Sequence, residues 1–408
     1  MKKTFVAAAV LGAFAASAMA ADVTLYGVID TGLHYSNKNV ESKHDVNSFD
    51  MKTGASAGNR WGLKGTEDLG NGYKVGFVLE NGFTEDDGQL GNGGRLFGRE
   101  ANLYVASDFG TLSFGRVGAL TSGCGSYDLM KYTPFATGWA GTATKANFML
   151  ADRDRMDNTV TYVTPSFAGV QVYAQYSFNR DGQETAGNER QNDRQNDRYA
   201  ALGATYKNGA FSSALVVDTV MHNNKSANDK DSLGVTLGAS YDFEVVKLFA
   251  MGQYGQHENF LGTTFDKGTK TTAEGTKYAA DYFKTLSSKG WKGYGVNLGA
   301  TAPVLGGTVL AQASYLDAKT HDAMKWQKAA KDEAAGVESH ADHQGTYKEA
   351  KAQNWGIALG YTYPFSKRTN VYTYVSYNET QVKTEAEAKD TDVTTKFTEF
   401  GLGIKHTF

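Results

Sequence analysis

Two basic residues share one face of a short alternating segment. In the stretch that begins at Arg60, the side chains of Arg60 and Lys64 lie opposite Trp61 and Leu63, because successive side chains of a strand point to opposite faces. A strand whose two faces differ in this way separates two solvents. The basic face predicts a water-filled space, and charges that line a narrow space of this kind orient dipolar solutes and bias the passage of ions.

The sequence gives weaker evidence for a catalytic site or a metal site than for this basic face. A nucleophilic enzyme needs a nucleophile, a histidine and an orienting acid, yet only His34 lies on a strand face predicted to point inward, and no serine precedes Ser36 on that strand. His340 and His343 are spaced for a metal but lie in a long polar connection, which favours a solvated loop. The single cysteine, Cys124, excludes an internal disulfide framework and is expected to be a small buried residue. The sequence predicts no cofactor and no catalytic residue.

The elements that must position the basic face are strands with a period of two. In the last one Phe400, Leu402 and Ile404 lie on one face, and Glu399 and Lys405 lie on the other. Sixteen such segments are expected, at residues 22–36, 56–66, 72–83, 96–107, 110–117, 157–164, 168–178, 198–207, 210–221, 231–242, 245–256, 290–302, 306–317, 353–363, 370–380 and 396–408.

The connections between these segments alternate between short turns and long polar stretches. Long connections are expected at 37–55, 84–95, 118–156, 179–197, 222–230, 257–289, 318–352 and 381–395. Outer-membrane barrels typically have an even number of alternating strands of about ten residues, with short turns at one end and long loops at the other. A strand edge left unpaired in lipid is costly, so the first and last strands should pair. The sequence therefore predicts an all-β fold, a 16-stranded antiparallel transmembrane β-barrel.

A barrel of sixteen strands is roughly 30 Å across, too wide for its own side chains to fill. It therefore holds water, and an open tube of that width would pass solutes indiscriminately. The segment 118–156 is rich in Gly, Ser and Thr, follows the fifth expected strand and has no strand alternation of its own. We expect this segment to fold into the lumen as a constriction loop.

Composition and charge exclude other classes of protein. The chain has 408 residues, 47 Gly, only 4 Pro, and 41 Lys+Arg against 44 Asp+Glu; without a basic block, a nucleic-acid partner is not expected. No later stretch approaches the length of an apolar membrane helix. Lys2 and Lys3 precede an apolar run that ends in small residues at Ala20, the order of a secretory signal. We expect residues 1–20 to be a cleaved signal peptide and residues 21–408 to form an exported barrel.

Several motifs run the length of the expected mature chain, and together they carry a family resemblance. They are Val23-Thr-Leu-Tyr-Gly-Val-Ile-Asp30, Arg60-Trp-Gly-Leu-Lys-Gly-Thr-Glu-Asp-Leu-Gly70, Leu96-Phe-Gly-Arg-Glu-Ala101, Phe109-Gly-Thr-Leu-Ser-Phe-Gly-Arg116, Arg155-Met-Asp-Asn-Thr-Val-Thr-Tyr162, Pro165-Ser-Phe-Ala-Gly169 and the terminal Phe408. In these motifs the chain resembles the general porins of Gram-negative bacteria, most closely the trimeric porins of beta-proteobacteria. The resemblance implies a homotrimer in outer-membrane lipid that passes ions and small hydrophilic solutes by passive diffusion. It also implies that the third long loop forms the constriction and that Phe408 helps the barrel-assembly machinery recognise the chain.

The resemblance also implies a basic cluster on the barrel wall that faces the constriction loop. Its members would be Arg60, Arg99 and Arg155, with Lys64 on the same face as Arg60 and Arg116 as a fourth arginine. Alternation alone leaves Arg99 undecided. Placing it inward along a continuous strand would turn Glu100 outward, an arrangement that suits a subunit interface better than lipid.

The acids opposite this cluster should lie on the loop. The chain departs here from the enterobacterial pattern, because no glutamate stands between Pro134 and Phe135, and the acids that remain are Asp128, Asp152 and Asp154. A constriction weighted toward positive charge predicts a weak anion preference. The excess of acids elsewhere opposes it, but salt screens distant charges within about 10 Å. A solute-specific channel, a barrel enzyme and an adhesin stay open as alternatives.

Overall fold

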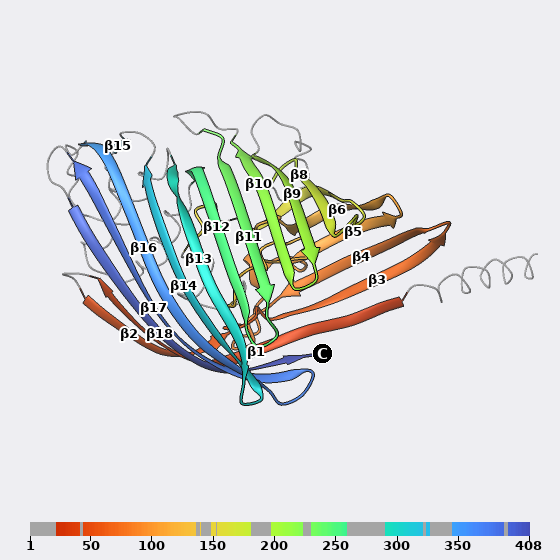
Figure 1. The fold of residues 1–408 in the computed structure, drawn as a ribbon, viewed down its shortest axis with the longest axis horizontal. Coiled ribbons are helices and arrows are strands. Elements are labelled where there is room, and N and C mark those ends of the chain that lie inside the picture. The colour runs from red at the N-terminus through yellow and green to blue at the C-terminus, as the bar shows by residue number, and fades with distance from the viewer. Residues whose placement is uncertain are drawn as a thin grey trace, which may run out of the picture.

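The protein forms a β-barrel whose strands run steeply across the molecule (Figure 1). The structure, a computed structural model, describes residues 22–40, 44–135, 139, 148–151, 153–180, 197–222, 230–258, 290–320, 324–326, 345–386 and 391–408. The expected signal peptide lies outside these residues. No helix among them is long and apolar enough to cross a membrane.

The described strands form one antiparallel sheet. They are β1 (Asp22–Val40), β2 (His44–Thr53), β3 (Arg60–Gly70), β4 (Tyr73–Gly82), β5 (Glu100–Ser107), β6 (Gly110–Gly118), β7 (Arg155–Val163), β8 (Val170–Ser177), β9 (Arg198–Asn208), β10 (Phe211–Met221), β11 (Leu233–Asp242), β12 (Lys247–Glu258), β13 (Trp291–Val304), β14 (Gly307–Thr320), β15 (Met324–Trp326), β16 (Gly345–Pro364), β17 (Thr369–Ala386) and β18 (Thr391–Thr407). A single helical turn, α2 (Gly91–Gly94), interrupts the connection from β4 to β5.

The eighteen strands amount to sixteen barrel strands, because β2 and β3 lie end to end in one position of the barrel and β14 and β15 in another. Both β2 and β3 pair with β1, one after the other along its length, and β15 continues the line of β14 along β16. The sheet closes where β1 pairs with β18, with Val28 opposite Thr407. Gly27 and Phe408 exchange two backbone hydrogen bonds of 3.1 Å at this seam. The predicted 16-stranded closed barrel is confirmed.

The outer face of the barrel is apolar and the inner face polar. On β1, Ile29 and Leu33 are exposed on the outside while Asp30 and His34 are buried inside. The last strand behaves as predicted, with Phe400, Leu402 and Ile404 exposed and Glu399 buried. This alternation matches a lipid-facing surface around a polar interior.

Aromatic residues mark both edges of the apolar band. On β16, Trp355 near one edge packs beside Tyr377, and Tyr363 near the other packs beside Phe365. Trp355 and Tyr363 are eight positions apart, which at a tilt of about 45° separates them by about 19 Å along the membrane normal. Aromatic residues of this kind gather at membrane interfaces because their rings are apolar and their tips polar. The turns from β13 to β14 and from β16 to β17 lie at the same end of the barrel as the C-terminus (Figure 1).

Three expected long connections are in part strand, which corrects the prediction. β1 runs on to Val40 and turns back through β2, so the stretch 37–55 is mainly a hairpin. Parts of 318–352 and 381–395 likewise belong to β14, β16, β17 and β18. In the hairpin, Phe49 and Met51 of β2 are exposed opposite Tyr35 and Leu33 of β1, so the apolar outer face continues for only a short distance. Two alternating apolar residues are too few for the sequence of β2 to mark a strand, although the backbone ladder continues.

Candidate functional site

The inner face of β1, β3, β4 and β5 carries a lateral row of polar side chains. Tyr26, Gly62, Glu80 and Glu100 stand opposite one another from strand to strand. Glu80 is central to this row. It accepts a hydrogen bond of 3.0 Å from the Tyr26 hydroxyl and lies 3.6 Å from Nε of Arg60. The predicted inward direction of Arg60 is confirmed by this contact.

Arg99 joins the same group from just outside β5. Its Nε donates a hydrogen bond of 2.7 Å to Oε1 of Glu80. Alternation could not place it, because β5 begins at Glu100 and Arg99 precedes the strand. Glu100 is therefore buried inside the barrel and Leu103 is exposed outside, so the polar outer face considered for this strand is absent. Arg99 lies over Gly58 and Gly82, where a Cβ would crowd its side chain.

Arg155 completes a group of three arginines, Arg60, Arg99 and Arg155, which we call the arginine wall. Burial, and after it the positive charge of Arg155, lowers the pKa of Arg99. Arginine nevertheless stays charged in proteins. Arg155 donates a hydrogen bond of 3.2 Å to Oδ1 of Asn92. Three cations therefore share this side of the lumen with one central carboxylate, that of Glu80.

The two other basic candidates occupy different places. Lys64 is exposed on the inner face, with its amine 5.4 Å from the centre of the Tyr26 ring. Arg116 instead pairs with Asp157 at 2.6 Å, and Arg95 reaches the same carboxylate at 2.8 Å. Arg116 belongs to this second cluster. The sequence pointed to neither Arg95 nor Asp157, because nothing in their local pattern marks them.

The three loop acids also separate. Asp128 is 6% exposed, and its carboxylate accepts hydrogen bonds from the backbone amides of Gly123 and Met130. Asp154 has an 80% exposed side chain and lies 3.4 Å from Arg155. Asp152 lies outside the described residues. Of the described loop acids, Asp154 is the one in contact with the arginine wall.

The cysteine of the loop is less buried than expected. Cys124 is partly exposed, which corrects the prediction that it is a small buried residue. Its backbone amide donates a hydrogen bond of 3.2 Å to the Ser122 hydroxyl, and its sulfur lies 4.0 Å from Oδ1 of Asp154. The polar surroundings of this part of the loop explain why Cys124 does not pack into an apolar core.

The described residues of the loop between β6 and β7 lie inside the barrel against the opposite wall, as predicted for this loop. Leu120, Leu129 and Phe148 of the loop are buried with Tyr199 and Val216 of the strands. Further along, Trp139 packs edge-on against Tyr372 and Tyr374, with ring centroids 5.2 and 5.4 Å apart. The buried core of this protein is thus the contact between the loop and the strands from β9 to β17.

Inward-facing glycines make room for the loop. A Cβ at Gly238 or Gly295 would strike Tyr132 or the backbone of Phe148, and a Cβ at Gly299 would strike Pro134. Gly203 of β9 and Gly360 of β16 meet Leu129 and Phe135 in the same manner. Glycine allows the close approach that any side chain would prevent. The glycines on this wall follow the course of the loop from β9 to β16.

A buried ionic group fastens the end of the loop. Arg153 is 4% exposed and contacts Asp218 of β10 at 2.6 Å and Glu258 of β12 at 2.7 Å. Burial alone would lower the pKa of Arg153, but the two carboxylates raise it above its usual range. Its guanidinium also donates a hydrogen bond of 3.1 Å to Ser232. No local pattern marks this anchor in the sequence, because its partners are 65 and 105 residues away.

The closed barrel, its apolar belt and its narrowed polar lumen define a channel of the outer-membrane class. The family model described as Gram-negative porin matches residues 7–383. The chain is 34% identical to an outer membrane porin protein of Bordetella pertussis over the whole of both chains. It is 30% identical to outer membrane porin protein 32 of Delftia acidovorans, across 92% of this chain and 89% of that one.

A solved structure agrees with these relatives. The anion-selective porin from Comamonas acidovorans superposes with a TM-score of 0.61 at 25% identity, covering 95% of this chain and 100% of that one. The chain belongs to the Gram-negative porin family. It is an outer-membrane porin, a water-filled channel for ions and small hydrophilic solutes.

Proposed function

We propose that this porin passes its solutes by passive diffusion, with a weak preference for anions set at the arginine wall. The observation that supports the preference most directly is the contact of Arg60 and Arg99 with one shared carboxylate, Glu80. Two guanidinium groups on one carboxylate leave net positive charge on that side of the lumen. The anion-selective porin from Comamonas acidovorans has a similar fold and sequence.

The balance of charge on this side explains why the preference should be weak. The arginine wall and Lys64 supply the cations, and the acids near them are Glu80, Glu100 and Asp154. Glu100 is 3% exposed and accepts a hydrogen bond from the backbone of Ser126. Bases exceed acids only slightly, so the field should favour anions without excluding cations.

We favour a channel over a barrel enzyme because of the surroundings of the inward histidine. Nε2 of His34 lies 3.0 Å from Oε1 of Glu399, and the Ser376 hydroxyl donates to the other oxygen of that carboxylate. The acid stands between the histidine and the serine. A nucleophilic serine instead needs its hydroxyl beside the base.

The assembly of the channel extends the proposal. We infer a homotrimer embedded in outer-membrane lipid, produced after removal of residues 1–20. Phe408, whose side chain is 43% exposed, is the signal we assign to the barrel-assembly machinery. Unheated gel electrophoresis and the mass of the mature chain test these points: a trimer band that collapses on boiling, and a chain beginning at Ala21, are expected.

The selectivity is tested by the zero-current potential of the purified protein in a planar bilayer under a tenfold KCl gradient. A potential with the sign of chloride permeation, well short of the ideal value, is the expected result. A potential with the sign of potassium permeation would overturn the proposed preference. Stable insertion without any conductance would favour the enzyme or adhesin alternative.

A further inference from the structure

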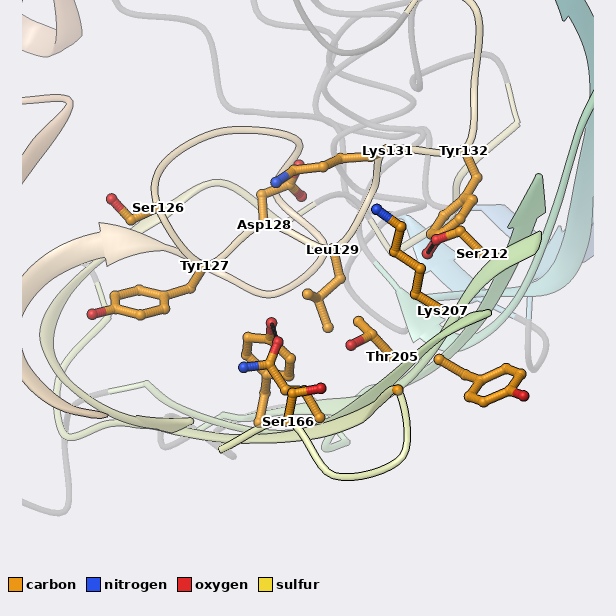
Figure 2. Close-up of a pocket in the computed structure, with 14 residues that line it drawn as sticks. Ser126, Tyr127, Asp128, Leu129, Lys131, Tyr132, Ser166, Thr205, Lys207 and Ser212 are labelled. Atoms are coloured by element: carbon orange, nitrogen blue, oxygen red, sulfur yellow. Dashed lines mark hydrogen bonds between the residues drawn. The ribbon is translucent and has the colours of Figure 1, made fainter. Parts of the chain in front are cut away.

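A cavity of about 470 Å³ lies between the loop and the wall formed by β8, β9 and β10 (Figure 2). The loop contributes residues 126–129 together with Lys131 and Tyr132, and the wall contributes Gln171, Tyr173 and Thr205 among others. Ser166 belongs to the short turn before β8, so the cavity faces the short-turn end of the barrel. Its size is within the range of pockets that hold small organic molecules.

Two lysine side chains line this cavity, one from the loop and one from the wall. Lys131 comes from the loop and Lys207 from the end of β9, and in Figure 2 the Lys207 side chain rises toward the loop segment that carries Lys131. Among the residues that the structure describes, no salt bridge involves either lysine. The acid nearest to them in sequence, Asp128, is held by the backbone amides of Gly123 and Met130. Two lysines against this one acid in the lining leave net positive charge, which can attract an anion.

The rest of the lining is aromatic and hydroxylic. Tyr127, Tyr132 and Tyr173 line the cavity together with Leu129. The Tyr132 hydroxyl lies 3.1 Å from the Ser212 hydroxyl, and burial raises the pKa of Tyr132, so it stays a neutral phenol. Phenol rings offer flat apolar surfaces for another ring. A hydrated inorganic anion would use none of these surfaces.

A second hollow of about 490 Å³ connects the cavity to the short-turn end. It shares Lys131, Tyr132, Lys207 and Ser212 with the first and adds Lys247 of β12 together with the acids Asp242 and Glu244, so three lysines face two acids there. The shared residues make the two hollows one continuous groove beneath the loop. A small solute can therefore enter the cavity from the lumen without passing between the strands.

We propose that this cavity is a solute subsite for small aromatic carboxylates, separate from the arginine wall. Lys131 and Lys207 would hold the carboxylate, and the tyrosines would contact the ring. The subsite goes beyond general diffusion, because a solute that pauses here is enriched in the channel. It does not depend on the sign of the channel's selectivity for small ions.

The proposal is tested with benzoate as the probe, added to single channels in a planar bilayer at constant ionic strength. Benzoate should cause brief current blocks, whereas acetate, which lacks the ring, and benzyl alcohol, which lacks the charge, should cause far fewer. In Lys131→Gln and Lys207→Gln the half-blocking concentration should rise at least fivefold. Lys367→Gln, in the exposed turn from β16 to β17, is the matched control and should block as the wild type does.

Three results would overturn the subsite. They are unchanged block in both lysine variants, an equal loss in the Lys367→Gln control, and loss of block in Arg99→Gln while the lysine variants block normally. The last result would place benzoate at the arginine wall instead. The unblocked conductance of each variant shows that the barrel has folded, and benzoate binding to detergent-folded protein, followed by NMR saturation transfer, gives a second readout.

Discussion

The two walls of the lumen are built differently although their strands follow the same alternation. On the wall of β1, β3, β4 and β5, the space beside the inward glycines is filled by side chains of the wall itself, with Tyr26 over Gly62 and Arg99 over Gly82. On the wall of β9 to β16, the same kind of space is filled by the loop, with Tyr132 over Gly238. The side chains of Arg60, Arg99 and Arg155 on one wall stay 27%, 15% and 11% exposed, whereas the other wall is buried beneath the loop.

This difference shows what decides the shape of the channel. Alternation fixes which residues face inward, but the kind of residue at each inward position decides what can lie on top of it. A wall of arginines is costly to bury because each charge would lose water. A wall of glycines and apolar residues such as Val216 gains from being covered. The loop lies where covering is favourable, which leaves the arginine wall partly exposed.

The largest effect is expected from removing the loop's ionic anchor. Arg153→Gln leaves Asp218 and Glu258 buried without their cation, and breaking a buried ion pair in this way costs about 3–5 kcal/mol. The midpoint of unfolding in detergent should fall and open-channel noise should rise. Arg198→Gln, at an exposed position at the start of β9, is the matched control. Equal stability of the two variants would contradict an anchoring role.

The next effect is expected where the loop crosses β13. In Gly295→Val the new side chain would strike the backbone of Phe148, so the loop must move toward the arginine wall. Single-channel conductance should fall to about half or less of the wild-type value. In Gly252→Val a Cβ meets no atom closer than 3.9 Å, and its conductance should be unchanged. If both variants conduct alike, the loop does not rest on Gly295.

A smaller effect is expected from neutralising the open wall. Arg60→Gln combined with Arg99→Gln should lower the ratio of chloride to potassium permeability roughly two- to fivefold, which corresponds to about 0.4–1 kcal/mol per ion. Zero-current potentials in a KCl gradient measure the ratio, and the effect should shrink at high salt because of screening. Lys367→Gln removes one positive charge in an exposed turn and should leave the ratio unchanged.

The smallest effect is expected from the one described loop acid that contacts this wall. Asp154→Asn should raise the anion preference by less than about 1.5-fold, because an exposed ion pair is weak. The same potential measurement detects it. A large rise, or a change of the opposite sign, would show that the acid matters more than its 80% exposure suggests.

Much of the fold could be predicted from the sequence, because a lipid-facing strand must show its two solvents at every second residue. On β1, for example, the apolar Ile29 and Leu33 are exposed on the outer face, and the polar Asp30 and His34 are buried on the inner face. The strand extensions that include β2 could not be predicted in this way. In β2 the alternation is limited to Phe49 and Met51, so the backbone ladder defines this extension better than the sequence pattern does.

The site was predictable in part for a similar reason. Arg60 and Lys64 lie inside a regular strand, where parity gives their direction. Arg99 stands just before β5, and its direction comes from the pairing with Glu80. Arg153 and its partners come together only through tertiary folding, so no local pattern could reveal them. Arg116 shares a motif with the family, yet its partner is Asp157, and a role at the constriction stays a prediction for it.

The measurement that tests the difference between the walls most directly compares the reactivity of one cysteine on each. In a Cys124→Ser background, Lys64→Cys lies on the open wall and Val216→Cys lies beneath the loop, where Val216 is 1% exposed. A charged methanethiosulfonate reagent should modify Lys64→Cys at least about a hundredfold faster than Val216→Cys in the folded channel. Equal rates would mean that the loop does not cover this wall, and the account of the constriction would fail.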